Sequence, residues 1–151
     1  MQLTHPARLT EGPQSAPPWF LSRAASTFSE AIKDAEILLA QFDLINTKPP
    51  PPHAEVLKRA GLIMAITAWE TYVEDRVAEA LEERLKSVDG SSFGDLVRKQ
   101  FQEDLKKLNN PNSTKTCNLF SDYLGLDAAK HWTWTNMDVK TVKQRLDNLL
   151  A

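Results

Sequence analysis

Hydrophobic residues recur every three or four positions along most of this chain, which is the spacing of amphipathic α-helices. The longest such stripe predicts a helix over residues 54–87, the longest in the protein. Its apolar face consists of Leu62, Ile63, Ile66, Trp69, Val73, Val77, Ala80 and Leu81. Glu70 falls on this same face, between Ile66 and Val73, and is the one acidic residue near the middle of the stripe.

A carboxylate on an apolar face is costly to bury unless a cation, a proton or several hydrogen-bond donors satisfy it. Glu70 therefore marks either a structural ion pair or a functional site. Arg59 and Arg84 lie near the two ends of the stripe, and either of them, or a basic side chain of a neighbouring helix, could be a structural partner. We expect Glu70 to be largely buried and to contact a cation or several donors.

A second strong stripe predicts a first helix over residues 19–45. Its apolar positions are Phe28, Ala31, Ile32, Ala35, Leu38, Leu39, Phe42 and Ile45. The prolines at 49–52 end this helix, and we interpret them as a linker between two antiparallel helices; the alternative is a ligand for an aromatic groove. Four prolines interrupt residues 1–18, which are expected to form a flexible arm, so that residues 19–151 form a single domain.

Shorter helices follow the turn at Asp89-Gly90. Ser92 and Asp95 resemble a capping box and begin a third helix, which ends before the sequence Asn109-Asn-Pro-Asn112. Its apolar face is Phe93, Leu96, Val97, Phe101, Leu105 and Leu108. A fourth helix begins at Ser113 and ends at Gly125, and residues 127–134 are expected to add a turn or two.

The last predicted helix has a start signal but no end signal. Asp138 is a plausible N-cap, and the inward positions are Val139, Val142, Leu146, Leu149 and Leu150. The apolar period continues intact to Ala151, where neither glycine nor a basic last turn closes the helix. Either this helix docks with a frayed end, or the natural protein continues.

No segment alternates with a period of two over the length of a strand, so the predicted fold class is all-α, a bundle of about four to five main helices. The length of 151 residues suits one domain with a real core. A single cysteine excludes an internal disulfide, and the chain has no apolar run of signal-peptide or membrane-spanning length, so we expect a cytoplasmic protein without membrane contact. The net charge of −2 means that any RNA contact needs a local basic patch.

Few residues suggest chemistry by themselves. The five glycines form no phosphate-binding loop, and His5, His53 and His131 are too scattered to suggest a metal cluster, so no cofactor or metal is predicted. Cys117 could be a nucleophile, but its place beside apolar helix positions favours a buried thiol. His131 could be a general base, although a surface or packing role is favoured because no nucleophile or acid accompanies it.

Three tryptophans, Trp69, Trp132 and Trp134, could stack on bases, but core and interface anchors are the favoured interpretation. We expect the chain to form a two-fold homodimer because Trp132 and Trp134 add to an already crowded set of apolar faces.

Two stretches carry a family resemblance. Residues 62–75, LIMAITAWETYVED, resemble the second helix of HEPN domains of the RiboL-PSP type, with an aromatic-Glu-x-aromatic core. Residues 110–126, NPNSTKTCNLFSDYLGL, followed by Trp132-Thr-Trp134, are similar to the Asn-Pro, Leu-Phe and Leu-Gly-Leu segment of the same family. The resemblance covers roughly residues 25–151.

This resemblance implies a helical bundle that commonly pairs into dimers. Many members are metal-independent ribonucleases of toxin–antitoxin, abortive-infection and antiviral systems, and others are RNA-binding or interaction modules without catalysis. The active motif is an Arg, usually followed by a polar residue, with a His four to six positions beyond the Arg. The Arg would hold the scissile phosphate, and the His would assist proton transfer at the 2′-hydroxyl.

The sequence departs from the family at this motif. Arg145 is the only arginine after Arg98, and positions 149–151 are Leu, Leu and Ala, so no Arg…His pair can be assembled. The run from Arg145 to Leu150 resembles the segment that precedes the motif, which would place the missing pair beyond Ala151. Only Glu70 carries over as a family position, supporting either the site or the core.

Two functions remain open at this point. The first is an RNA-targeting domain of a toxin or antiviral defence ribonuclease, inactive over residues 1–151, with RNA and a cognate antitoxin or defence-system protein as partners. The second is a non-catalytic helical module for dimerisation or partner binding. The sequence does not identify RNA-binding residues.

Overall fold

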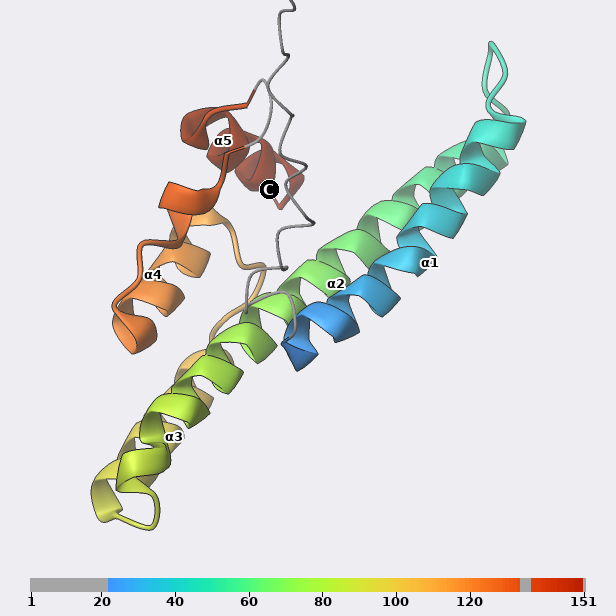
Figure 1. The fold of residues 1–151 in the computed structure, drawn as a ribbon. Helices are drawn as coiled ribbons and strands as arrows, with labels where there is room; N and C mark the ends of the chain where they lie inside the picture. The colour runs from blue at the N-terminus through green and yellow to red at the C-terminus, as the bar shows by residue number, and fades with distance from the viewer. Residues whose placement is uncertain (1–21, 134–136, 151) are drawn as a thin grey trace, which may run out of the picture.

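The computed structural model describes residues 22–133 and 137–150, which form five α-helices and two short 3₁₀ helices and contain no β-strand (Figure 1). The helices are α1 (Arg23–Ile45), α2 (Pro52–Leu85), α3 (Ser92–Leu105), α4 (Ser113–Leu124) and α5 (Val139–Leu149), with 3₁₀ helices η2 (Lys86–Val88) and η3 (Ala128–His131). The predicted all-α class is confirmed. The predicted arm, residues 1–18, lies outside the described residues.

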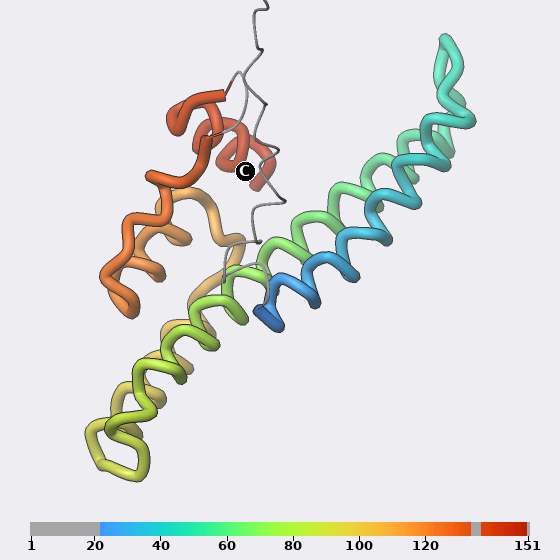
Figure 2. Tube along the Cα trace, in the orientation of Figure 1, coloured from blue at the N-terminus to red at the C-terminus, as the bar shows by residue number. Residues whose placement is uncertain are grey.

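The first two helices form a long antiparallel hairpin (Figure 2). Ser22 caps α1 by accepting a hydrogen bond from the Ala25 N–H through its Oγ, at 3.0 Å, so the helix begins at Arg23 and not at residue 19 as predicted. Pro52 occupies the first turn of α2, where a missing N–H costs nothing. With 34 residues, α2 is the longest described helix, as predicted.

A close backbone approach holds the hairpin together at Gly61. A Cβ atom at this position would lie 3.5 Å from both the Ala35 carbonyl oxygen and the Leu38 Cβ. Since Gly61 and Ala35 are buried, small residues at this crossing let the two helices pack closely.

The main core lies on the C-terminal half of α2, on the side away from α1. Its fully buried members are Val73, Val77, Leu81 and Leu85 of α2, Phe101 of α3, and Leu119 and Leu124 of α4. The N-terminal half of α2 pairs with α1 alone and extends away from the rest of the molecule as an arm (Figure 1). We call the part of the hairpin formed by residues 32–66 the hairpin arm, or simply the arm; it is distinct from the N-terminal arm predicted for residues 1–18.

The arm leaves apolar side chains uncovered, which corrects part of the predicted core. Leu39, Leu62 and Ile63 were expected to face inward, but they are 54%, 41% and 63% exposed. The periodicity placed Leu62 and Ile63 on the correct face of α2. That face is covered by α3 and α4 only from about Trp69 onward, so its first half lacks a covering helix.

The start of α3 also differs from the prediction. Ser91, not Ser92, is the N-cap, and its Oγ accepts from the Gly94 N–H at 3.1 Å. Phe93 and Leu96, predicted to be inward, are 62% and 64% exposed, whereas Phe101 is buried. Arg98 of α3 pairs with Glu82 of α2 at 3.1 Å and with Asp89, in the turn between the two helices, at 2.9 Å.

The C-terminal elements pack around α4. Gly125 ends α4 in the left-handed conformation, at φ 61°, as its position predicts. Residues 127–134 were expected to be helical, and η3 provides that turn. Asp138 caps α5 as predicted, through the Thr141 N–H at 2.8 Å, but no residue of α5 is fully buried, and Leu149 is 51% exposed.

No described helix is both long and apolar enough to cross a lipid bilayer.

Candidate functional site

Glu70 lies on α2 where the covered part of its outer face meets the uncovered part. Val73, one turn further, is fully buried in the core, and Ile63, two turns before, is 63% exposed. Glu70 itself is half-buried, with an exposure between those of these two residues. Within residues 22–133 and 137–150, no ion pair or hydrogen bond to its carboxylate is found, so neither Arg59 nor Arg84 is its partner in this chain.

Two more carboxylates follow Glu70 on α2. The pKa of Glu74 is raised above its ordinary value, first because the group is partly buried and then because Glu70 and Asp75 repel its negative charge. These residues do not form a metal site. Within the described residues, no group of three or more His, Cys, Asp or Glu side chains is arranged so that it could hold a metal ion. The arrangement attracts a cation but provides no acid–base pair.

Next to Glu70, Trp69 anchors the Asn-Pro loop. Its Nε1 donates to the Pro111 carbonyl oxygen at 3.3 Å, and the Thr116 hydroxyl donates to the same oxygen at 3.1 Å. The Trp132 ring meets Trp69 edge-on, with ring centroids 6.3 Å apart. Both tryptophans therefore hold the fold together, as anchors rather than as free stacking platforms, and Trp134 lies outside the described residues.

Asp147 ties α5 to the start of α4, an interaction that the sequence analysis missed. Its two carboxylate oxygens accept from the backbone N–H of Ser113 at 2.8 Å and from the Ser113 hydroxyl at 2.9 Å. A carboxylate in the last turn of a helix opposes the helix dipole, whereas one at the start of a helix stabilises it. An acidic residue at this position, with no basic neighbour closing the helix, was the signal that Asp147 has a partner elsewhere.

Three cations on α5 are left without acidic partners. Lys140, Lys143 and Arg145 make no ion pair within the described residues, and Asp147, the only carboxylate inside the helix, is bound to Ser113. Lys140 and Arg145 are exposed and Lys143 is half-exposed. This helix is the basic element that sequence reasoning did not locate.

The other sequence candidates do not form a catalytic group. His131 is exposed on η3, which agrees with a surface role, and Cys117 is half-buried rather than buried on α4. No hydrogen bond joins either residue to an acid or base in the described parts of the chain.

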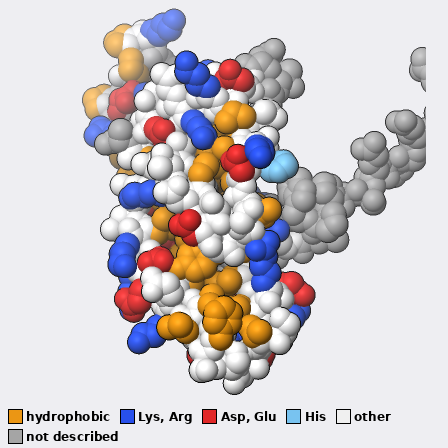
Figure 3. Space-filling model, turned by 90° about the vertical axis from the view of Figure 1, so that its left-hand side faces the viewer, with side chains coloured by type: hydrophobic (Ala, Val, Ile, Leu, Met, Phe, Trp, Pro, Cys, Tyr) orange, Lys and Arg blue, Asp and Glu red, His pale blue; other side chains and the backbone are white. Residues whose placement is uncertain are grey.

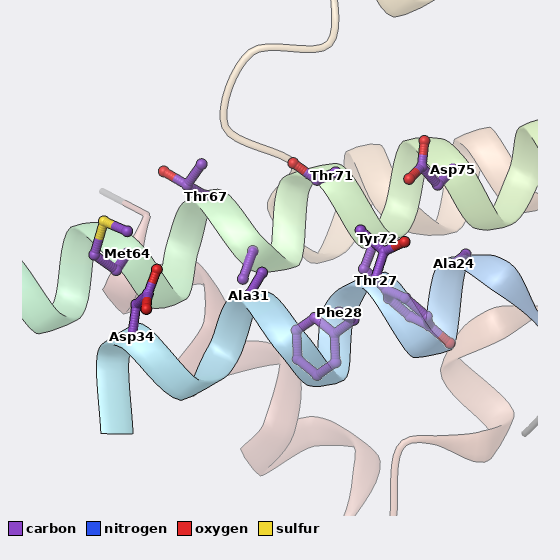
Figure 4. Close-up of a pocket in the computed structure, with 11 residues that line it drawn as sticks. Ala24, Thr27, Phe28, Ala31, Asp34, Met64, Thr67, Thr71, Tyr72 and Asp75 are labelled. Carbon is purple, nitrogen blue, oxygen red and sulfur yellow. The ribbon is translucent and has the colours of Figure 1, made fainter. Parts of the chain in front are cut away.

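A small hollow lies along one seam of the hairpin (Figure 4). The rings of Phe28 and Tyr72 lie along it, with centroids 5.2 Å apart, and Thr67 and Thr71 point away from α1. Its volume of about 100 Å³ is below the several hundred Å³ of a typical ligand pocket. The hollow is therefore a packing defect of the hairpin rather than a substrate site.

Comparison with known protein families matches residues 29–151 to the family model described as RiboL-PSP-HEPN. Comparisons with curated proteins and with solved structures find no match. The matched range includes all of α2 to α5 and most of α1.

Proposed function

Because the chain belongs to the RiboL-PSP-HEPN family, we propose that it is an RNA-directed module of a toxin or antiviral defence system, without ribonuclease activity over residues 1–151. The observation that carries this proposal is the set of unpaired cations on α5. Phosphate groups dominate the affinity of proteins for nucleic acid, and each Lys or Arg contact adds to a salt-dependent attraction. Lys140, Lys143 and Arg145 provide three such groups on one short helix.

The surroundings of α5 support its role as a binding element. The bond between Asp147 and Ser113 fixes its C-terminal part against α4, and it directs both carboxylate oxygens of Asp147 to Ser113 and not to a cation of α5. With two lysines, one arginine and one aspartate, residues 139–149 carry a formal charge of +2, although the whole chain carries a net charge of −2. Catalysis is not part of the proposal because residues 1–151 contain no Arg with a His four to six positions beyond it.

Titration of a structured RNA, followed by fluorescence anisotropy in EDTA at several salt concentrations, tests this proposal. We expect Lys140→Ala, Lys143→Ala and Arg145→Ala together to weaken binding at least tenfold and to reduce the salt dependence by about two to three ion contacts. The matched control replaces Lys33, Lys58 and Lys86, which already pair with Glu30, Glu55 and Glu83.

Equal loss of binding in both triple variants would show that only total charge matters and would contradict a specific role for α5. Absence of RNA binding in the unmodified protein would overturn the proposal.

A protein-binding module is the second candidate. Hydrophobic side chains gather between charged ones in the lower half of the face drawn in Figure 3. Phe93, Leu96 and Leu126 are each more than half exposed, and exposed apolar groups of this size favour a protein partner such as a cognate antitoxin or another defence-system protein. RNA titration separates the two candidates.

A further inference from the structure

The hairpin has two seams between α1 and α2, and they differ in the side chains that line them. One seam holds the small hollow, with Asp34 on its α1 side and Thr67 on its α2 side. At about 100° per residue, Leu39 and Leu62 lie on the opposite side of each helix relative to the line of contact at Gly61. Both leucines therefore border the second seam, which is apolar.

This second seam is open along the arm. Leu39 and Leu62 are 54% and 41% exposed, and Ile32 and Ile66, which share their sides of the two helices, are half-buried. We call these four residues the seam face. Within the described chain no further helix covers it, whereas α3 and α4 cover Val73 on the same side of α2. The seam face therefore continues the core side of α2 into solvent.

Two carboxylates border the seam face on α1. Glu36 and Asp43 are exposed and are seven residues apart, so they lie on the same side of the helix and are separated by about two turns. Neither carboxylate makes an ion pair or a hydrogen bond within residues 22–133 and 137–150. On the α2 border, Arg59 and Glu70 carry opposite charges, so the excess negative charge around the face comes from α1.

The chemistry of the seam face selects a protein helix as its occupant. Unpaired carboxylates repel the phosphate groups of nucleic acid, and exposed apolar side chains of this size favour contact with protein. Apolar positions on two packed helices suit the apolar stripe of a third helix. The part of α2 on the arm, residues 52–66, spans about 22 Å, so a helix of about four turns fits along it.

We propose that the seam face binds an amphipathic helix of another protein, whose apolar stripe covers the four seam residues and whose Lys or Arg side chains pair with Glu36 and Asp43. The basic residues of the partner then need the same spacing of two turns. One helix buries less than the ~800 Å² per partner of a standard interface, so the affinity is micromolar. This site rests on no part of the RNA proposal, and it lies apart from Phe93, Leu96 and Leu126 because none of these belongs to the arm.

Two synthetic helical peptides test this assignment. Each has about three heptads with leucine at positions a and d, and the flanking positions e and g are lysine in one peptide and glutamate in the other. Like charges at e and g keep each peptide from pairing with itself. Fluorescence anisotropy of the labelled peptides with the full chain should show micromolar binding of the lysine peptide and at least tenfold weaker binding of the glutamate peptide.

Variants of the seam face and its border locate the binding. Glu36→Lys together with Asp43→Lys should reverse the preference between the two peptides, because the border becomes positive. Leu39→Asp should weaken binding of the lysine peptide at least tenfold, and it should keep the helical circular dichroism and melting temperature because this side chain is more than half exposed. The matched control Leu96→Asp, at an exposed leucine of α3, should leave binding unchanged.

Several outcomes would overturn the proposal. These are absence of binding, equal binding of the two peptides, and unchanged binding by Leu39→Asp. Sedimentation velocity without peptide covers the other occupant: a change in the protein's own association caused by Leu39→Asp would assign the seam face to a second copy of the chain and would also overturn the proposal. The α5 triple variant should bind the lysine peptide normally, which keeps this result separate from the RNA test.

Discussion

Single residues decide how the C-terminal elements are joined. Asp147 satisfies two donors of Ser113 at the first turn of α4, where backbone N–H groups lack helical partners. Asp147→Ala is expected to lower the free energy of unfolding by about 1–2 kcal/mol, the usual cost of losing a side-chain cap. Urea denaturation measures this loss, and the exposed neighbour Asn148→Ala is the control. Equal midpoints for the two variants would show that the contact contributes nothing.

Tyr123 and Asp104 form the clearest pH-sensitive contact. The Tyr123 hydroxyl donates to the Asp104 carboxylate at 2.6 Å, which lowers the pKa of Asp104; burial and this same carboxylate raise the pKa of Tyr123. The stabilisation of the folded state by Asp104 is therefore fully present above the ordinary carboxylate pKa of about 4, and it is lost as the pH falls through the lowered pKa of the folded state. The stabilisation of the folded state by the Tyr123 hydroxyl is fully present below about pH 10, the ordinary pKa of tyrosine, and it is lost as the pH rises through the raised pKa of the folded state.

Replacing Tyr123 by Phe should reduce stability at neutral pH. It should also make the losses of stability at acidic and at alkaline pH smaller, because the mutant has neither the hydrogen-bond donor to Asp104 nor a phenol that ionises. Urea midpoints at about pH 3, 7 and 10.5 test this expectation. The Phe101–Tyr123 ring contact, with centroids 4.9 Å apart, is retained in the variant and isolates the hydroxyl. A pH profile identical to that of the unmodified protein would contradict the assignment.

At the scale of elements, one face of α2 has two environments. Leu81 is 4% exposed in the core, whereas Leu62, on the same helix, is 41% exposed on the arm. Leu81→Ala is expected to cost about 2–5 kcal/mol because a cavity remains. Leu62→Ala is expected to change stability by less than about 1 kcal/mol, since much of the Leu62 side chain is already exposed and alanine favours helix. If thermal or urea unfolding shows similar losses of stability for the two variants, Leu62 must be buried by a contact in solution, which would contradict this expectation.

For the whole molecule, the central expectation concerns catalysis. Residues 1–151 should not cleave a structured RNA in EDTA, because an Arg…His pair at helical spacing is absent and general acid–base assistance is worth about 10²–10⁴-fold. Gel analysis of RNA incubated with the protein and with its His131→Ala variant measures this. Cleavage that survives the His131 substitution would place the chemistry elsewhere in the chain. A longer protein that supplies the pair should cleave RNA under the same conditions.

The sequence by itself determined the helices and their order. Local signals, such as the 3.6-residue period of α2, the cap at Asp138 and the left-handed end at Gly125, depend only on neighbouring residues and were correct within a few positions. The predicted start of α3 at Ser92 was off by one residue, because the adjacent Ser91 offers the same hydroxyl and only the backbone geometry selects one of the two as the cap. The family followed from motifs within these same helices.

Only the tertiary structure decided which apolar positions are covered. Ile63 and Val73 both belong to the predicted apolar face of α2, but α3 and α4 reach only the second half of this helix. Ile63 is therefore exposed, whereas Val73 is fully buried. The same cause explains Glu70, which was recognised as unusual yet lies at the edge of the core rather than within it. Likewise, Asp147 and Ser113 are 34 residues apart, and no local pattern states that two such residues meet. Burial and long-range pairing depend on where the other helices end, which helical periodicity does not encode.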